Sequence, residues 1–418
     1  MREIFYIEDT PANRISYYLL LAFLVTLPFD RVYSELSLIG LLLHTLLHPG
    51  KDRRWSLRWA GWLIAGLFLL MAVSAVYAPS FGDAGKQLEK QLAILLFPVI
   101  AWFSQLDWER VRGRLLKAFA WSCLGTVVYL YGCAFSSIYS LGLGFEALFT
   151  PQFLNHAFSA PLDLHATYLS MYVVVAMVVF ISGAVEGDDG NGKAGWRRWG
   201  YWLVSLVLLV ALLQLASRAV CLSLLVILNV LVPWMLLKGR ARRVVLAGAV
   251  VVSGLGLALV TMNDNLNTRY LVQLKYDMQR VRNREVDPEP RMVRWGCAWD
   301  LIKARPLTGY GAGAEVPKLK EEYYAQNLVI SYTHELNAHN QYLSYMLNGG
   351  LPAGLWYVAV LAVAGITAAR RRDIFLGTLV VVIVFVSFSE NLLDTNKGIF
   401  FFSCFFTLFL YRPRAGAA

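Results

Sequence analysis

Long apolar runs separated by short polar segments dominate the chain. Residues 60–78 and 244–262, for example, contain no Asp, Glu, Lys or Arg. Each run is close to the roughly 20 apolar residues that an α-helix needs to cross a bilayer. The pattern therefore predicts a polytopic membrane protein.

About twelve segments fall in or near the length window of a membrane-spanning helix. They are residues 15–29, 33–47, 59–78, 91–104, 118–135, 166–184, 201–215, 219–237, 244–262, 350–369, 375–389 and 398–411. No small-residue cleavage site follows the first segment, so we interpret it as a retained helix and not as a signal peptide. The expected fold class is all-α, a polytopic integral membrane helical bundle of about 12 transmembrane helices.

One connection is much longer than the others. It holds about 75 residues, whereas most connections in proteins are short. Within it, Met292, Trp295, Trp299 and Ile302 recur at helical spacing. We therefore expect a small helical cap over the outer membrane surface, between helices one to nine and helices ten to twelve. These divisions are residues 1–262 for the first nine helices, 263–338 for the cap and 339–418 for the last three helices.

Charge patterning predicts the orientation in the membrane. Hydrophobic residues make up 57% of the chain and charged residues 16%, against about 25% charged residues in soluble domains. The formal net charge is +10, and the basic residues gather in alternate segments. They are Arg2, Arg14, Lys51, Arg53, Arg54, Arg58, Arg110, Arg112, Arg114, Lys117, Lys193, Arg197, Arg198, Lys238, Arg240, Arg242, Arg243, Arg370, Arg371, Arg372, Arg412 and Arg414. Because such residues favour the cytoplasmic side, both termini are expected in the cytoplasm. This signal accounts for the net charge, so nucleic-acid binding is not predicted.

No motif in the sequence indicates a cofactor. Residues 306–315, PLTGYGAGAE, lack the preceding strand and third glycine of a dinucleotide-binding motif and the Lys-Ser/Thr ending of a P-loop. A glycine turn explains them better. The five cysteines form no C-x-x-C pair and no metal-like spacing with the histidines, so neither a disulfide framework nor a metal site is expected.

Arg218 lies between two long apolar runs, at the expected outer edge of the membrane. A charge near hydrocarbon costs about 2.5–3.5 kcal/mol on insertion scales, so this arginine needs an anionic partner or water. It is either a snorkelling residue in a short outer turn or the ligand of an anionic head group, which a guanidinium can bind through two hydrogen bonds. The sequence leaves both interpretations open.

Other polar residues are expected at the same face. Arg291 and Arg294 flank the predicted helix of the cap, and Lys90 belongs to another outer segment. His165 and Tyr168 begin a span from the outside. Together with Arg218 they would form a cationic pocket at the outer interface.

His339 stands where the long outer segment ends. With an intrinsic pKa of roughly 6.5, a histidine side chain is largely neutral at pH 7 and can accept a proton. Asn340 and Gln341 follow directly, and their amides can orient a sugar hydroxyl or the ring itself. The alternative is a histidine that only caps the next helix or lies at the interface.

The order of these features resembles the O-antigen ligase family, within a broader group of O-antigen polymerases and protein oligosaccharyltransferases. The resemblance covers most of the chain: about twelve spans and a long outer loop between the ninth and the tenth. The pair Ser217–Arg218 and the run of residues 291–313 also match. A signature of His-Asn followed about nine residues later by Gly is matched by His339, Asn340 and Gly350.

The sequence departs from the family pattern at Ala353, where many members have Gly, Thr or Tyr, although Gly354 follows at once. This affects only the expected geometry of the loop. The resemblance implies a lipopolysaccharide-biosynthesis glycosyltransferase of the Gram-negative inner membrane with its active site in the periplasm. The donor would be O-antigen polysaccharide on undecaprenyl pyrophosphate, and the acceptor a sugar hydroxyl of lipid A–core. Membrane lipids would surround the protein, and no cofactor would be required.

The resemblance also implies roles for individual residues. His339 would act as the base in an inverting, metal-independent displacement. Arg218 and Arg291, with Lys90 and Arg294, would bind the leaving pyrophosphate. The residues expected to orient the substrates are Asn340, Gln341, His165 and Tyr168.

Three alternative functions remain open at this point. An O-antigen polymerase would use the same donor but extend a glycan, and a protein O-oligosaccharyltransferase would transfer the glycan to Ser or Thr. A lipid or solute transporter would use the charges as a translocation path. Transporters often carry internal repeats and broken helices at matching positions, and neither is visible in this sequence.

Overall fold

The computed structural model describes residues 2–30, 32–50, 59–186, 194–279 and 289–410. Within these ranges every regular element is a helix, which confirms the expected all-α class. Each of the twelve segments that the sequence predicts to span the membrane overlaps a helix.

Six helices among the described residues are long and apolar enough to cross a membrane, and four shorter apolar helices accompany them. The long helices are α6 (Trp108–Ser140), α8 (Ala166–Glu186), α9 (Ala194–Leu215), α10 (Arg218–Val226) with its continuation through η4 (Ile227–Leu231) and α11 (Val232–Leu236), α12 (Gly239–Met262) and α18 (Gln341–Arg371). The shorter apolar helices are α3 (Val32–Leu47), α4 (Trp59–Ala75), α19 (Ile374–Ser387) and α20 (Asn396–Leu410). The chain is therefore a helical membrane protein.

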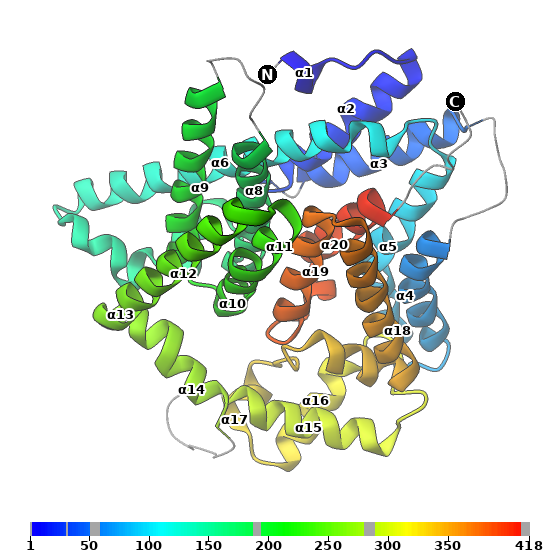
Figure 1. Cartoon of the computed structure of the whole chain (residues 1–418). Helices are drawn as coiled ribbons and strands as arrows, with labels where there is room; N and C mark the ends of the chain where they lie inside the picture. The colour runs from blue at the N-terminus through cyan, green and yellow to red at the C-terminus, as the bar shows by residue number, and fades with distance from the viewer. Residues whose placement is uncertain (1, 31, 51–58, 187–193, 280–288, 411–418) are drawn as a thin grey trace.

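The remaining helices are shorter or more polar. They are α1 (Arg2–Phe5), α2 (Pro11–Thr26), α5 (Phe81–Phe103), η1 (Phe145–Phe149), η2 (Pro151–Phe153), α7 (His156–Ser159), η3 (Ala160–Leu162), α13 (Asp264–Asn267), η5 (Thr268–Val272), α14 (Gln273–Asp277), α15 (Arg291–Ala304), α16 (Glu315–Ala325), α17 (Val329–Thr333) and η6 (Leu392–Asp394). Figure 1 shows α15, α16 and α17 together at one end of the molecule, opposite α1.

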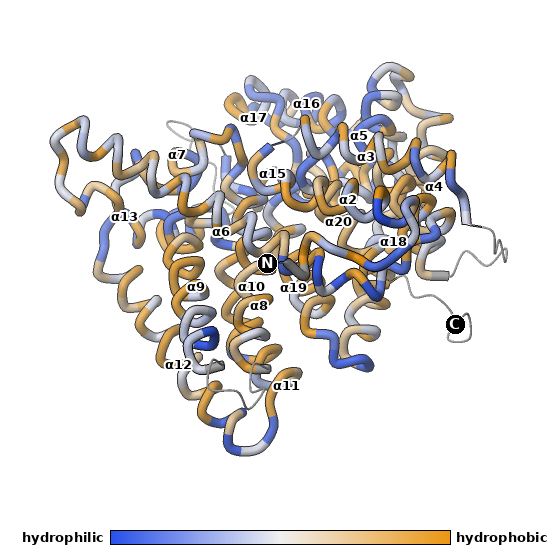
Figure 2. The backbone as a smooth tube through the Cα atoms, turned by 90° about the horizontal axis from the view of Figure 1, so that it is seen from above, coloured by the Kyte–Doolittle hydropathy of each residue, from blue (hydrophilic) through white to orange (hydrophobic). Residues whose placement is uncertain are grey.

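Helix α8 forms the centre of the bundle. In its most apolar stretch 89% of the residues are buried. The helix packs against α6, α9, α10 and α19. Its sequence is apolar on all sides, as expected for a helix that is surrounded by other helices. Helix α12 is similarly apolar, but only 6% of the residues in its most apolar stretch are buried. Figure 2 shows many orange, apolar positions along α12, and because few of its residues are buried they form a surface suited to contact with lipid.

Helices α15 and α16 pack on the start of α18 through one apolar cluster. Helix α15 contributes Cys297, α16 contributes Leu319 and Tyr323, and α18 contributes Leu347. Helix α15 contains residues 292–302, for which the helical spacing predicted a helix, so that prediction is confirmed. The cluster fixes the first turns of α18.

The glycine-rich segment between α15 and α16 is a turn, as its sequence predicts. Gly309, Gly311 and Gly313 have φ angles of 62°, 95° and 75°. A Cβ atom at Gly311 would collide with Ala78, so only glycine fits there. The N–H of Gly311 donates to the carbonyl of Asn348 at 2.8 Å, which ties the turn to α18.

Helix α18 is broken at Gly350, whose φ of 71° is not helical. The carbonyl of Leu307 lies against this glycine and leaves no room for a side chain. Glycine adopts a positive φ of this size readily, which explains why the break falls at this residue. The part of α18 before the break therefore differs in direction from the part that continues to Arg371.

Candidate functional site

His339 lies in the segment that leads into α18. Its φ is 46°, a left-handed conformation that costs a non-glycine residue about 1–3 kcal/mol. Its N–H donates to Oδ1 of Asn337 at 3.0 Å, and the N–H of Asn340 donates to Oδ1 of Asn391 at 2.8 Å. These bonds hold the strained backbone and fix the point from which the imidazole ring extends.

Two side chains of α15 hold the same segment. The indole N–H of Trp295 donates to the carbonyl of Ala338 at 2.9 Å. Arg294 is only 5% exposed, and its Nη1 donates to the carbonyl of Asn337 at 3.5 Å. Arg294 therefore supports the backbone beside His339. The expectation that Arg294 binds pyrophosphate stays a prediction.

The imidazole of His339 faces a carboxylate. Its Nδ1 lies 3.5 Å from Oε2 of Glu390, in the connection between α19 and α20. The side chain of Glu390 is 14% exposed and that of His339 is 31% exposed. Burial alone would raise the pKa of Glu390, but His339, His165 and Arg291 hold it below its usual value. The carboxylate is therefore ionised at neutral pH.

Two further histidines lie near this pair. The ring centroids of His156 and His165 are 4.2 Å apart, and those of His165 and Tyr168 are 5.2 Å apart. Burial lowers the pKa of His165 to about 4, an effect that Glu390 partly opposes. His165 is therefore neutral at pH 7, and the structure places it, with Tyr168 beside it, near Glu390.

We expect His165 to make the protein less stable in acid. In the unfolded chain its pKa returns to roughly 6.5, above the folded value of about 4. As the pH falls from the first value toward the second, the unfolded chain takes up a proton that the folded protein does not, so the free energy of unfolding decreases. Thermal unfolding in detergent should give a lower Tm at about pH 5 than at about pH 7.5. His165→Asn should reduce this difference, and an unchanged difference would contradict the assignment.

Three arginines gather around one carboxylate at the end of α14. Nη2 of Arg218 lies 2.7 Å from Oδ2 of Asp277, and Nε of Arg291 lies 3.6 Å from the same oxygen. Arg269 is also near: burial and the charge of Arg218 lower its pKa. These four residues, here called the arginine cluster, carry three positive charges against one negative charge. The cluster therefore attracts anions.

Arg291 connects the arginine cluster to the histidine. Besides its contact with Asp277, its Nη1 donates to the carbonyl of Ser389 at 3.0 Å, one residue before Glu390. The structure thus brings together Arg218, Arg291 and His339, three residues that the sequence analysis selected from segments far apart in the chain.

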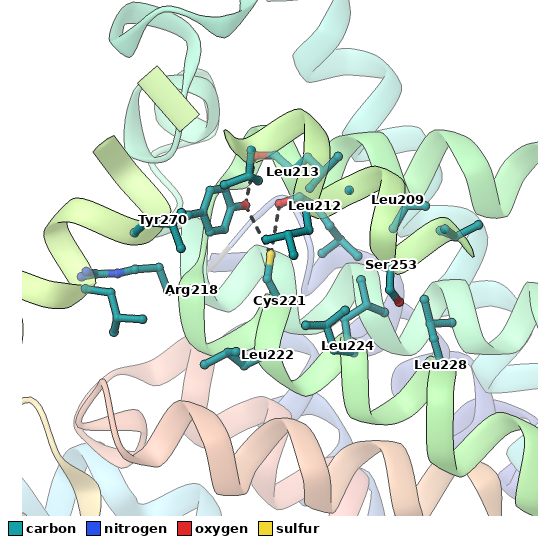
Figure 3. A pocket seen from close by; sticks show the side chains of 17 residues that line it. Leu209, Leu212, Leu213, Arg218, Cys221, Leu222, Leu224, Leu228, Ser253 and Tyr270 are labelled. Atoms are coloured by element: carbon teal, nitrogen blue, oxygen red, sulfur yellow. Dashed lines mark hydrogen bonds between the residues drawn. The ribbon is translucent and has the colours of Figure 1, made fainter. Parts of the chain in front are cut away.

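An apolar pocket of about 200 Å³ begins at the arginine cluster. In Figure 3, Arg218 lies at one end of the pocket, and Leu228 and Ser253 lie toward the other. Helices α9, α10 and α12, with the segment from η5 to α14, supply its walls, which consist mainly of leucine. Nη1 of Arg218 is buried and has no hydrogen-bond partner among the described residues, which leaves part of its hydrogen-bonding capacity unused.

Lys90 lies in a different pocket. This second pocket, of about 640 Å³, is lined by residues of α3, α5 and the start of α20, among them Lys86, Glu89 and Asp394. Within the part of the chain that the structure describes, no hydrogen bond or ion pair joins Lys90 to the arginine cluster. The expectation that Lys90 binds pyrophosphate stays a prediction.

Asn340 and Gln341 anchor the start of α18. Oδ1 of Asn340 accepts two backbone N–H groups of the first turn, at 3.0 and 3.2 Å, and so caps the helix. Oε1 of Gln341 accepts the N–H of Leu393 at 2.6 Å. Both residues are buried and steady the segment that carries His339. That they also orient a substrate stays a prediction.

Sequence analysis missed Glu390, Asp277 and Arg269. Glu390 belongs to the run SENLLDTN, which separates two apolar stretches. An ionisable residue beside a membrane span is costly and therefore informative, whether its charge is positive or negative. The argument that selected Arg218 would have selected Glu390 as well.

The region that carries the arginines and the histidine matches a known family. Residues 203–358 match a family model described as O-antigen ligase. This part of the chain is a domain of the O-antigen ligase family. A comparison with curated proteins finds no match.

The matched region runs from α9 into the second part of α18 and includes Arg218, Arg291 and His339. Lys90 and Glu390 lie outside it. Members of the O-antigen ligase family are glycosyltransferase-like enzymes of O-antigen processing. Together with the apolar helices, this domain indicates a multi-pass bacterial membrane protein.

Proposed function

We propose that the protein is an O-antigen ligase, which transfers O-antigen polysaccharide from undecaprenyl pyrophosphate to a sugar hydroxyl of lipid A–core. The observation that supports this most directly is the arginine cluster beside His339. A leaving pyrophosphate needs cationic groups to stabilise its developing charge, and an attacking hydroxyl needs a base. The site offers cationic groups and a candidate base, joined through the contact of Arg291 with the carbonyl of Ser389 beside Glu390.

The apolar pocket is suited to the hydrocarbon tail of the donor. It begins at Arg218, so a diphosphate bound by the arginine cluster would place the start of its prenyl chain among leucines. Helix α12 forms one wall and is only 6% buried, so the pocket borders the lipid. A lipid-linked donor would therefore enter sideways, without leaving the bilayer.

In the proposed reaction the acceptor hydroxyl oxygen attacks the anomeric carbon of the donor sugar. As the new C–O bond forms, the C–O bond to the diphosphate breaks, and Nε2 of His339 takes the hydroxyl proton. The diphosphate leaves with the bonding electron pair, and Arg218 and Arg291 stabilise its additional negative charge. One displacement of this kind inverts the anomeric centre.

The proposal includes an arrangement in the membrane. Helices α2 and α5, together with the six long and four shorter apolar helices, would make twelve spans. The basic residues favour cytoplasmic termini, so the site would face the periplasm of a Gram-negative cell from its inner membrane. Residues 263–338 would then form a periplasmic cap between the membrane helices of residues 1–262 and 339–418.

The other predicted residues have supporting places in this proposal. His165 and Tyr168 would border the surface on which the acceptor sugar lies. Asn340 and Gln341 hold the segment of the base. Lys90 and Arg294 would add positive potential at longer range, which attracts an anionic donor.

A ligation assay with purified components tests the proposed function. The protein is incubated with undecaprenyl-pyrophosphate-linked O-antigen and lipid A–core, and the products are separated on a gel. We expect polysaccharide of donor length to appear on lipid A–core. A glycan that lengthens on its lipid carrier would indicate a polymerase, and transfer to Ser or Thr of a protein would indicate an oligosaccharyltransferase. The absence of any covalent product would favour a transporter.

A further inference from the structure

Glu390 is a sheltered carboxylate to which the proposed reaction assigns no role. It lies in the connection between α19 and α20, and its side chain is only 14% exposed. A charge in such a sheltered place is costly unless neighbouring groups compensate it. Its Oε2 lies 3.5 Å from Nδ1 of His339, which makes the proposed base its immediate neighbour.

We propose that Glu390 is a positioning residue for the base. It accepts the Nδ1–H of His339, so that Nε2 is unprotonated and faces the acceptor hydroxyl. It also stabilises the imidazolium ion that forms once Nε2 has taken the hydroxyl proton. This inference rests on the proposed function, because it assigns Glu390 a role in the same transfer.

The accessibility of the two ring nitrogens supports this orientation. Nδ1 of His339 is buried and makes no hydrogen bond of normal geometry, so the carboxylate of Glu390 at 3.5 Å is the partner nearest to hand, whereas the side chain as a whole is 31% exposed. Nε2 makes no hydrogen bond to any described residue and is not among the buried atoms. The Nδ1–Oε2 separation of 3.5 Å is longer than a normal hydrogen bond. Catalytic hydrogen bonds are often this long without substrate and shorten in the complex.

The residues on both sides of Glu390 are fixed to the elements that carry the base. The carbonyl of Ser389 accepts Nη1 of Arg291, from α15, at 3.0 Å. The side chain of Asn391 accepts the N–H of Asn340, at the start of α18, at 2.8 Å. The carboxylate and the imidazole are therefore held in one framework, and neither can shift far without the other.

The charged and titratable groups that face this carboxylate come from three elements. They are His339 at the start of α18, Arg291 of α15, and His165 and Tyr168 at the start of α8, with His156 behind His165. Burial gives His165 a pKa of about 4, so it stays neutral near pH 7. Arg291 is already shared with Asp277. His339 is thus the neighbour whose charge changes during the proposed reaction.

Glu390→Gln tests the inference because it removes the charge and keeps the size of the side chain. We expect kcat of ligation to fall about 10- to 100-fold. The KM for the donor should stay within about twofold, since the arginine cluster is unaltered. The acidic limb of the pH–kcat profile should move to lower pH, because an imidazole without a neighbouring carboxylate is protonated less readily.

Two further variants separate charge from structure. Glu390→Asp keeps the charge at a greater distance, so its acidic limb should lie between those of the wild type and Glu390→Gln. If Glu390→Gln does not fold, the comparison of Glu390→Asp with the wild type is the test. Asp300→Asn is the matched control: Asp300 is an exposed carboxylate of α15 that pairs with Lys303, so the acidic limb of this variant should stay at the wild-type pH.

A measurement without substrate distinguishes this inference from the proposed function. Histidine ¹⁵N NMR, with the His339 signals identified through His339→Gln, reports the tautomer and the titration of the ring directly. If the wild-type protein shows the Nδ1–H tautomer but forms no ligation product, the proposed function is refuted and the contact between Glu390 and His339 still stands. An identical His339 titration in wild type and Glu390→Gln, or a variant with wild-type kcat and an unshifted acidic limb, overturns the role of Glu390.

Discussion

His339→Ala is expected to lose about 10²- to 10⁴-fold in ligation rate, the contribution of a positioned general base. The substitution removes the imidazole that faces Glu390 and leaves Arg218, Arg291 and Asp277 in place. Donor binding should therefore stay near the wild-type value. Ligation of a defined donor to lipid A–core, measured alongside donor binding by the same variant, separates the loss of chemistry from a loss of binding.

Two controls sharpen this test. His334→Ala changes an exposed histidine at the end of α17, five positions earlier, and should ligate at the wild-type rate. His339→Gly removes the same ring as alanine but relieves the left-handed backbone, so it should be equally inactive and somewhat more stable. If His339→Ala ligates at the unmodified rate, or fails only because the donor no longer binds, His339 is not the base.

Arg218→Ala is expected to lower ligation by about 10²- to 10³-fold, the typical loss when one stabilising donor is removed from an active site. The loss should include weaker donor binding, because Nη1 of Arg218 is unpaired and lies at the start of the apolar pocket. Arg218→Lys should recover only part of the activity, since an ammonium lacks the planar fork that binds two oxygens at once.

Arg218→Ala also leaves Asp277 with fewer cationic partners, and an uncompensated carboxylate would itself repel a diphosphate. The double variant Arg218→Ala/Asp277→Asn separates the two effects. It should recover part of the loss if repulsion contributes, and it should remain below the wild type because the guanidinium is still missing. Full activity of purified Arg218→Ala would remove this arginine from the mechanism.

The sequence alone predicts the helices well because membrane helices are long, apolar and locally encoded. The spacing within residues 292–302 predicted α15, and the glycines of residues 306–315 predicted a turn; both are confirmed. The break at Gly350 was likewise visible as a glycine at the expected start of a span. Each of these features depends on neighbouring residues only.

The pairing of charges could not be predicted in the same way. Arg218 and Asp277 are 59 residues apart, and no local pattern indicates that α10 and α14 meet. The sequence placed Arg291 and Arg294 in one pyrophosphate-binding group, with Arg291 the stronger candidate, but could not show that one reaches the carbonyl of Ser389 and the other that of Asn337. Which side of a helix faces a site depends on the packing of the whole chain, so roles assigned by position alone remain incomplete.

Asp277 has a consequence for turnover. Its carboxylate occupies the point where Arg218 and Arg291 converge. A diphosphate that binds as proposed takes over these guanidinium groups, and the carboxylate recovers them when the spent carrier departs. An attached anion competes with the incoming donor as well as with the spent carrier, so it weakens the binding of both. The site would thus bind the donor less tightly and, in return, release more readily a lipid product that stays close by in the membrane.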